Sequence, residues 1–238
     1  MYDLTIIIPL SRHLNVPFVA EQLTKQQHAL NLKILLLVDN LHITPTHINN
    51  HFAQFDYQAE WTGKRPAGEA NIGQRRQHIA DVLNFGRQQT INSPYIMILE
   101  DDTELKPDTI QSLYNQRHDG IISAIQAGRH HYKIIGAWNI TPETYTSIPY
   151  EPTETCDAIG LYCLIQPTKQ YQETPFAYDP NLPIGPDVTY TQQFPIKLDW
   201  NQQLGHLTHN GVIYPGSDCD IITFTKQEDR WQLAQLQI

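Results

Sequence analysis

The chain has 238 residues, which suffices for one large α/β domain or two small ones, and we interpret it as one domain. Its composition, 40% hydrophobic and 17% charged, is that of a globular protein and excludes a disordered or fibrous one. The net charge of -9 argues against a protein that grips nucleic-acid phosphates, because that affinity comes mostly from lysine and arginine. We therefore expect no nucleic-acid partner.

The sequence shows no targeting or membrane-spanning signal. No apolar run approaches the roughly 18 residues of a membrane span, and residues 6–10 are too short a run, without a basic flank, for a signal peptide. Cys156, Cys163 and Cys219 form no C-x-x-C pair and leave an odd thiol, which fits a reducing compartment. We expect a cytoplasmic protein without a transmembrane segment, and attachment to a membrane face stays open.

Strands and helices alternate in the first half of the chain. Residues 3–11, DLTIIIPLS, and 32–40, LKILLLVDN, are apolar runs typical of fully buried strands. Between them we predict a helix that is capped by Asn15 and extends to about residue 30. A second helix is predicted to begin at Asn71. The apolar residues expected on its buried face are Ile72, Ile79, Val82 and Leu83.

The alternation continues with residues 95–99, YIMIL, which predict another buried strand. A further helix is expected to open at Pro107 and Asp108, with Ile110 and Leu113 facing inward. This order of elements indicates an α/β fold with a mostly parallel central sheet flanked by helices. The two early strands end in polar residues, at the edge where such a sheet presents its ligand site.

From residue 133 onward the pattern is less regular. Residues 157–166, DAIGLYCLIQ, predict one strand with Gly160 inside it, and a glycine there is typical of close approach by a ligand or another backbone. The tail from Cys219 fits either a β-hairpin around residues 227–229 or a strand followed by a helix. The sequence does not decide between the two.

Three consecutive acids, Glu100, Asp101 and Asp102, directly follow the strand predicted at residues 95–99. Adjacent carboxylates repel one another, so we expect the cluster to gain a cation, a shared proton or full solvation. If the strand geometry persists, Glu100 and Asp102 share one face and Asp101 lies on the other. Two carboxylates on one face at this edge suit Mg²⁺ or Mn²⁺. The ordinary alternative is a solvated acidic turn with a helix-capping aspartate.

Four basic residues fall close together in an otherwise acidic chain, and they are Lys64, Arg65, Arg75 and Arg76. Such a cluster suits a compact anion such as a diphosphate. Cations in the first turns of a helix oppose its dipole, whereas a bound phosphate makes the same place favourable. The alternative is that both arginines are solvated, or pair with Glu69 and Asp81.

Seven segments in order make the chain similar to a known family. They are TIIIPLS, ILLLVDN, NIGQRRQHIA, YIMILEDDTEL, CDAIGLYCLI, GPDVTY and LGHLTHNG, and from first to last they span nearly the whole chain. The chain resembles the nucleotide-sugar-dependent glycosyltransferases of the GT-A fold, of the large second family. The resemblance implies a UDP- or GDP-sugar donor, Mn²⁺ or Mg²⁺, inversion at the sugar, and a hydroxyl acceptor on a glycan, a lipid-linked molecule or a protein.

The resemblance also implies roles for the acids and for one histidine. Glu100, Asp101 and Asp102 match the D-x-D metal motif, with Asp102 as the direct ligand. Because Glu100 replaces the usual aspartate, it is expected to act on the ribose or through water. His206, in LGHLTHNG, matches a third metal ligand, although a single histidine near a strand end is more often structural. His209 is the weaker candidate and is expected to face solvent.

The nucleotide and the acceptor are assigned to further residues by the same resemblance. Pro9 and Ser11 match the turn beside the nucleotide base, and Asp39 matches the acid that reads the base or ribose, a turn former being the alternative. Asp187 matches the base that takes the acceptor proton, although Pro186 stands where the family has glutamate. Its alternative is to cap a helix beginning at Val188.

Two more residues are assigned to the acceptor side. Asp157 lies where the family lines the acceptor site, a surface turn being the alternative, and Trp138 could stack on a sugar ring, a place in the core being the alternative. The predicted division of the single GT-A-like domain is a nucleotide-binding half, residues 1–105, and an acceptor half, residues 106–238.

Other functions remain open at this stage. A nucleotidyltransferase would need a glycine-rich phosphate loop after the first strand, and IIIPLSRH contains no glycine. A metal-dependent nuclease, phosphatase or other phosphodiesterase would need more acids spread over several strands. A catalytically degenerate glycosyltransferase-like binding module is the alternative outside the enzymes, with Glu100 and Pro186 as its marks.

Overall fold

The computed structural model describes residues 1–63, 71–128, 133–227 and 230–237. The first half alternates strands and helices, as its sequence predicts. Its elements are β1 (Leu4–Leu10), α1 (Asn15–Thr24), β2 (Leu32–Val38), α2 (Pro45–Phe52), β3 (Tyr57–Trp61), α3 (Ile72–Arg87), β4 (Tyr95–Leu99), β5 (Thr103–Glu104) and α4 (Thr109–Asn115). β1 lies parallel between β2 and β4, and β3 pairs parallel with β2.

The second half adds strands to this sheet and builds another one. Its elements are β6 (Ile121–Gln126), β7 (Ala137–Ile140), β8 (Thr144–Ser147), β9 (Thr155–Cys156), β10 (Ala158–Ile159), β11 (Cys163–Pro167), α5 (Thr168–Glu173), α6 (Pro186–Thr191), β12 (Ile196–Thr208), β13 (Gly211–Ile213), β14 (Ile221–Gln227) and β15 (Arg230–Gln237). The large sheet has the order β13-β12-β6-β11-β4-β1-β2-β3, and the smaller one β10-β7-β8-β14-β15. β11 is antiparallel to both its neighbours, so β4, β6 and β12 point the same way.

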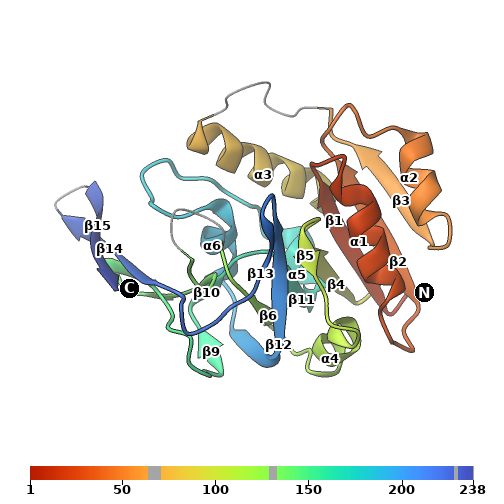
Figure 1. Cartoon of the computed structure of the whole chain (residues 1–238). Coiled ribbons are helices and arrows are strands. Elements are labelled where there is room, and N and C mark those ends of the chain that lie inside the picture. The colour runs from red at the N-terminus through yellow and green to blue at the C-terminus, as the bar shows by residue number, and fades with distance from the viewer. Residues whose placement is uncertain (64–70, 129–132, 228–229, 238) are drawn as a thin grey trace.

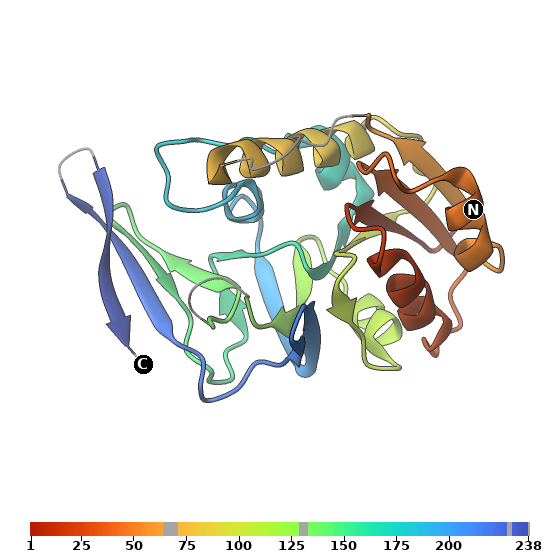
Figure 2. The same ribbon diagram turned by 45° about the horizontal axis from the view of Figure 1, so that its top comes forward.

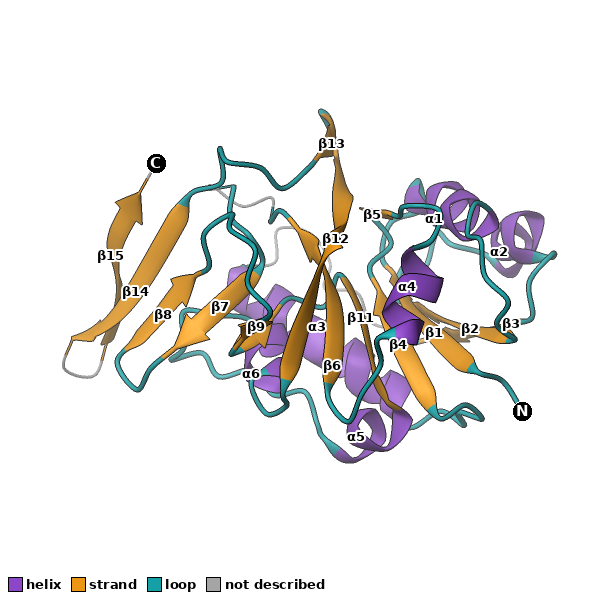
Figure 3. Cartoon of the chain, turned by 90° about the horizontal axis from the view of Figure 1, so that it is seen from below, coloured by secondary structure: helices purple, strands orange, loops and turns teal. Residues whose placement is uncertain are grey.

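Helices cover both faces of the large sheet. α1, α2 and α4 lie on one side of it, and α3, α5 and α6 on the other (Figure 3). Both faces of β1, β2 and β4 are therefore covered, which explains why these strands are apolar at nearly every position. The β14–β15 hairpin lies at the end of the molecule away from β2 and β3 (Figures 1 and 2). Among the described residues, no helix is both long and apolar enough to cross a membrane.

Two hydrophobic clusters correspond to the two sheets. The larger one runs from Leu4 to Leu204 and joins strands from both halves of the chain. The smaller one lies beside the second sheet and comprises Ile134, Trp138, Tyr145, Ala158, Ile184, Val188 and Ile222. Because the larger cluster takes in residues from β1 through β12, the edge where β1, β2, β4 and β12 end rests on one continuous core.

The helix predicted from Asn15 to about residue 30 ends at Thr24 instead. Beyond it, the backbone N–H of Gln27 donates to Pro107 O at 2.7 Å, and the Gln26 side chain donates to Lys106 O at 2.8 Å. These contacts with the segment before α4 replace the helical hydrogen bonds. Asn15 is not the cap, because Leu14 holds that position and Asn15 donates its side-chain amide to Asp101.

Helix α3 begins where predicted, but its buried face differs. Asn71 and Gln74 form a reciprocal capping box at its start. Its buried residues all lie in the second half, including Val82 and Leu83, whereas Ile72 and Ile79 are 63% and 47% exposed. The first half lies over residues 176–186 rather than over the sheet, as the Arg76 side chain contacting Pro183 O shows.

Residues 157–166 form two strands rather than the single predicted one. β10 belongs to the small sheet and β11 to the large sheet, and Gly160 lies between them. A Cβ on Gly160 would lie 3.1 Å from the Tyr162 ring, so a side chain is what approaches it closely.

The tail forms the hairpin β14–β15, which decides the alternative that the sequence left open. α4 begins at Thr109, and Ile110 and Leu113 are buried as predicted.

Candidate active site

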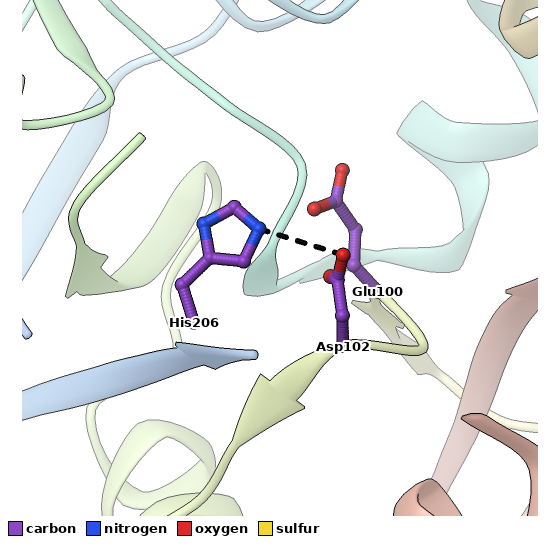
Figure 4. A group of neighbouring side chains, drawn as sticks. All are labelled: Glu100, Asp102 and His206. Carbon is purple, nitrogen blue, oxygen red and sulfur yellow. Dashed lines mark ion pairs between the residues drawn. The ribbon is translucent and has the colours of Figure 1, made fainter. Parts of the chain in front are cut away.

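The polar residues that follow β1, β2 and β4 meet at the carboxyl edge of the large sheet. Glu100, Asp102 and His206 offer ligand atoms that all lie within 4.8 Å of one another. Figure 4 shows the imidazole of His206 directed at Asp102, with Nε2 at 3.4 Å from Oδ2, and Glu100 beside them. The first two residues come from the end of β4 and the third from β12, so the fold joins positions more than a hundred residues apart.

Backbone hydrogen bonds fix the turn that carries the acids. Glu100 N–H donates to Tyr162 O at 3.0 Å, and Leu207 N–H donates to Asp102 O at 2.8 Å. Immediately after the acids, β5 pairs with β12, which places Thr103 opposite His206. Strands on both sides therefore hold the carboxylates at fixed positions. The strand ends at Leu99, so the three acids lie in a turn and not in a strand. Their side chains still point in two directions, as predicted, but strand alternation is not the cause.

His206 is held by its other ring nitrogen. Nδ1 lies 2.8 Å from Ala127 O, and in the tautomer that donates this hydrogen bond the Nε2 lone pair faces Asp102. Burial of the ring lowers the pKa of His206, but the contact with Asp102 and the charge of that carboxylate outweigh burial and raise it. Two carboxylates and one imidazole form a donor set that fits Mn²⁺, and Mg²⁺ fits the oxygens alone.

Asp101 points the other way, toward the turn after β1. Its Oδ2 accepts the backbone N–H groups of Ser11 at 3.1 Å and Arg12 at 3.2 Å, and its Oδ1 accepts the side chains of Arg12 and Asn15. Burial raises the pKa of Asp101, and the Arg12 charge opposes that rise. All these partners belong to residues 11–15, which follow β1, so Asp101 ties this segment to the acidic turn.

Arg12 is a site residue that the sequence analysis missed. Its Nη1 lies 2.8 Å from Oδ1 of Asp101 and 2.5 Å from Oδ2 of Asp102. Burial lowers the pKa of its guanidinium, but the charges of Asp101, Asp102 and Glu100 outweigh that effect and raise it. The available signal for Arg12 was its position directly after the first strand, at the edge where such a sheet presents its ligand site.

Asp39 lies at the end of β2 and is 4% exposed. Its Oδ2 accepts the hydroxyl of Ser11 at 2.9 Å and lies 2.8 Å from Nε2 of His78, a residue of α3 that the sequence analysis also missed. In the described part of the chain, Oδ1 of Asp39 is buried and makes no hydrogen bond. A buried carboxylate oxygen of this kind can accept a hydrogen bond from a ligand. Pro9, half-buried in β1, precedes Ser11 by two residues.

The predicted basic cluster is described only in part. Arg75 is exposed on α3, and Nη2 of Arg76 donates to Pro183 O at 2.9 Å. The alternative partner Asp81 instead accepts a hydrogen bond from Gln77. Lys64, Arg65 and Glu69 lie outside the described residues.

Asp187 is half-buried in the first turn of α6. The helix begins at Pro186 with Gly185 as its N-cap, so the alternative role of Asp187, as the cap of a helix beginning at Val188, is wrong. A Cβ on Gly185 would lie 2.3 Å from the Asp187 carboxylate, and one on Gly160 would lie 3.6 Å from it. Gly185 therefore leaves room for this carboxylate, whereas a Cβ on Gly160 would be in ordinary contact with it.

The two remaining acceptor candidates lie elsewhere. Trp138 is 8% exposed in the smaller core, 6.3 Å from the Phe224 ring, so the prediction that it stacks on a sugar is corrected. Asp157 is exposed, and its Oδ2 accepts the Ile140 N–H at 2.7 Å. Asp157 lines a cavity of about 470 Å³ beside Ile196, at the amino end of β12 and far along that strand from His206. His209 is exposed, as expected.

Known structures share this architecture at low sequence identity. The crystal structure of GalNAc-T7 with UDP, GalNAc and Mn²⁺ matches 87% of this chain and 43% of that one, with a TM-score of 0.58 and 11% identity. The mannosyltransferase PcManGT from Pyrobaculum calidifontis, in complex with GDP-Man and Mn²⁺, matches 88% of this chain and 58% of that one, with a TM-score of 0.56 and 12% identity. The chain has the GT-A fold.

A third structure with the GT-A fold is S. aureus TarS, which matches 84% of this chain and 35% of that one with a TM-score of 0.55 and 10% identity. The chain spans less than two thirds of each of these three proteins. No family profile matches the chain. No curated protein matches it in sequence either.

Proposed function

We propose that this chain is a metal-dependent glycosyltransferase that moves a sugar, with inversion, from a UDP- or GDP-sugar to an acceptor hydroxyl. The observation that carries the proposal is the group of Glu100, Asp102 and His206 at the carboxyl edge of a GT-A sheet. Ligands in open α/β sheets bind at this edge. Two of the structures with the same fold hold Mn²⁺ together with UDP or GDP-Man.

Asp102 and His206 are the direct metal ligands in this proposal, and Glu100 acts directly or through water. Mn²⁺ suits the set better than Mg²⁺ because it accepts imidazole more readily. When bound, the divalent cation would offset the charge that develops on the leaving diphosphate. The side chains in turn are held in place by Ala127 O and by the strands that flank the acidic turn.

The nucleoside is assigned to Pro9, Ser11 and Asp39. Oδ1 of Asp39 is buried and makes no hydrogen bond with the residues that the structure describes, which supports this role because an N–H of the base or a ribose hydroxyl would satisfy it. Arg75 and Arg76, in the first turns of α3, are assigned to the diphosphate. Asp101 acts on the site through the loop that it holds.

Asp187 is the proposed base. Its carboxylate would take the proton of the acceptor hydroxyl while the new O–C bond forms and the bond from the sugar to the diphosphate breaks. Its half-buried place in the first turn of α6, where Gly185 leaves room for the carboxylate, supports the role. Asp157 stays assigned to the acceptor, a glycan, lipid-linked or protein hydroxyl, and would act at a distance from the reacting atoms. Residues 1–105 form the proposed nucleotide-binding half of one domain, and residues 106–238 the acceptor half.

Isothermal titration tests the proposal. Wild-type protein is titrated with UDP, GDP and the common UDP- and GDP-sugars, with and without Mn²⁺, and the titrations are repeated on Asp102→Asn. The matched control is Asp119→Asn, an exposed aspartate at the amino end of β6. We expect Mn²⁺-dependent binding of one nucleotide, weakened about tenfold or more in Asp102→Asn and unchanged in the control. Absence of binding by the wild type contradicts the proposal, and metal-independent binding retained by Asp102→Asn supports the degenerate binding module.

A further inference from the structure

Arg12 contacts the same carboxylate oxygen that faces the proposed metal ligand His206. Oδ2 of Asp102 lies 2.5 Å from Nη1 of Arg12 and 3.4 Å from Nε2 of His206. The Asp102 carboxylate is 1% exposed, whereas the Arg12 side chain is 39% exposed. A cation that binds His206 and this oxygen of Asp102 must therefore share the oxygen with the guanidinium or take it over. The Arg12 side chain, unlike the Asp102 carboxylate, is therefore partly open to solvent.

The rest of the loop does not depend on this contact. Asp101 accepts the backbone N–H groups of Ser11 and Arg12 and the side-chain amide of Asn15, besides the guanidinium. All four contacts can remain if the Arg12 side chain leaves Asp102, and three remain even if it leaves Asp101 as well. The hydrogen bond from Nη1 to Oδ1 of Asp101, at 2.8 Å, is available to keep the guanidinium close by. Arg12 can consequently release Asp102 without any change in the backbone.

Arg12 weakens the attraction of the acids for a cation. Glu100, Asp101 and Asp102 bring three carboxylates together, and the guanidinium of Arg12 contacts two of them. Its positive charge makes this group of residues less negative by one charge. Removing the guanidinium restores that negative charge. The attraction of the acids for a divalent cation would then be stronger.

We propose that Arg12 is a built-in counter-ion of the metal site, which gives up Oδ2 of Asp102 to the cation, keeps Oδ1 of Asp101, and so sets how tightly the divalent metal binds. This inference rests on the proposed metal site. Arg12 is a positioning residue here and takes no part in the bond changes. Its consequence is unusual for a residue in an active site, because removing its charge strengthens binding of the metal instead of weakening it.

Electron paramagnetic resonance of free Mn²⁺ measures this affinity directly on the full chain, without any substrate. Arg12→Met removes the charge at similar length, Arg12→Lys keeps a charge but loses the planar fork, and Arg117→Met is the control, an exposed arginine near the opposite edge of the sheet. We expect Arg12→Met to bind Mn²⁺ about tenfold more tightly than wild type, Arg12→Lys to lie between them, and the control to equal the wild type. Equal or weaker binding by Arg12→Met overturns the inference.

Thermal unfolding and NMR keep the test decisive if Arg12→Met folds poorly. Because Asp101 and Asp102 lose the guanidinium, Arg12→Met should melt at a lower temperature and regain more on adding Mn²⁺ than the wild type does. In wild-type protein, the Arg12 side-chain N–H signal, assigned by its loss in Arg12→Lys, should shift when diamagnetic Mg²⁺ is added. An unshifted signal at saturating Mg²⁺ contradicts the inference while leaving the metal site intact. Absence of Mn²⁺ and Mg²⁺ binding by every protein contradicts the metal site and the inference together.

Discussion

Nε2 of His78 lies 2.8 Å from Oδ2 of Asp39 and thereby joins helix α3 to the end of strand β2. Ser11 donates to the same oxygen, and Oδ1 of Asp39 is left buried without a hydrogen bond in the described part of the chain. A buried carboxylate with one oxygen held by two partners and the other oxygen without a hydrogen bond among the described residues is suited to receive a donor from a nucleoside. His78 acts in this arrangement by positioning Asp39.

Asp39→Ala should weaken binding of the nucleoside diphosphate about tenfold, because the nucleoside loses the buried carboxylate that accepts its hydrogen bond. His78→Ala should weaken binding less, because it removes only the group that positions Asp39. The double variant should be no weaker than Asp39→Ala, since both changes act on one contact. Isothermal titration with the nucleotide that the wild type binds measures all three. His209→Ala, at an exposed histidine, is the control. Additive losses from the two single variants would show that His78 acts independently of Asp39.

Asp187→Asn should lower turnover about a hundredfold or more while leaving nucleotide affinity nearly unchanged, because a base contributes to the chemical step only. The assay follows slow release of nucleoside diphosphate from the nucleotide-sugar, with water as the acceptor. Asp119→Asn serves as the matched aspartate elsewhere on the surface. Full turnover in Asp187→Asn would remove Asp187 from the role of base.

The histidine cluster beside the first loop should make stability depend on pH. The His47 ring lies 3.8 Å from that of His13 and 5.3 Å from that of His51, measured between centroids. Burial, together with the charges of His13 and His51, lowers the pKa of His47 below its ordinary 6.5. As the pH falls, His47 therefore takes up a proton in the unfolded chain before it does so in the folded chain. The contribution of neutral His47 to the free energy of unfolding is fully present above about pH 6.5 and is lost as the pH falls toward the lower pKa of the folded state.

His47→Gln should therefore lose less stability than the wild type between pH 8 and pH 5, about the upper and lower limits of histidine titration. Urea unfolding at the two pH values gives the comparison. His209→Gln, which replaces an exposed histidine, should follow the wild type. An equal or larger acid loss in His47→Gln would contradict the sign of this linkage.

The start of α3 depends on its capping box. Asn71 Oδ1 accepts the Gln74 N–H at 2.9 Å, and Gln74 Oε1 accepts the Asn71 N–H at 3.0 Å. Asn71→Ala should lower the free energy of unfolding by about 1 kcal/mol, measured by urea unfolding. Asn50→Ala, at an exposed position inside α2, should cause no loss. A stability of Asn71→Ala equal to that of wild type would mean that α3 is held by its packing alone.

The elements that the sequence predicted well are those set by local pattern. β1, β2 and β4 are apolar runs bounded by polar residues, and burial on both faces leaves such runs few alternatives. The place of Glu100 and Asp102 at the end of β4 followed from the same pattern. Asp101 points away from them, but in a turn after Leu99 rather than by the strand alternation on which that prediction depended.

The features that sequence reasoning missed depend on distant contacts. Arg12 and His78 look like ordinary surface residues until the fold sets them against Asp102 and Asp39. The split of residues 157–166 into two strands arises because β10 pairs in one sheet and β11 in the other. The early end of α1 has a similar cause, since contacts with the segment before α4 replace its next turn.

The most direct test of the metal site is an anomalous difference map from crystals grown with Mn²⁺ and the nucleoside diphosphate that binds best. We predict a manganese peak bound by Asp102 and His206, with Glu100 beside it and the diphosphate oxygens on the ion. A nucleotide bound in the crystal with no manganese at these three residues would contradict the account.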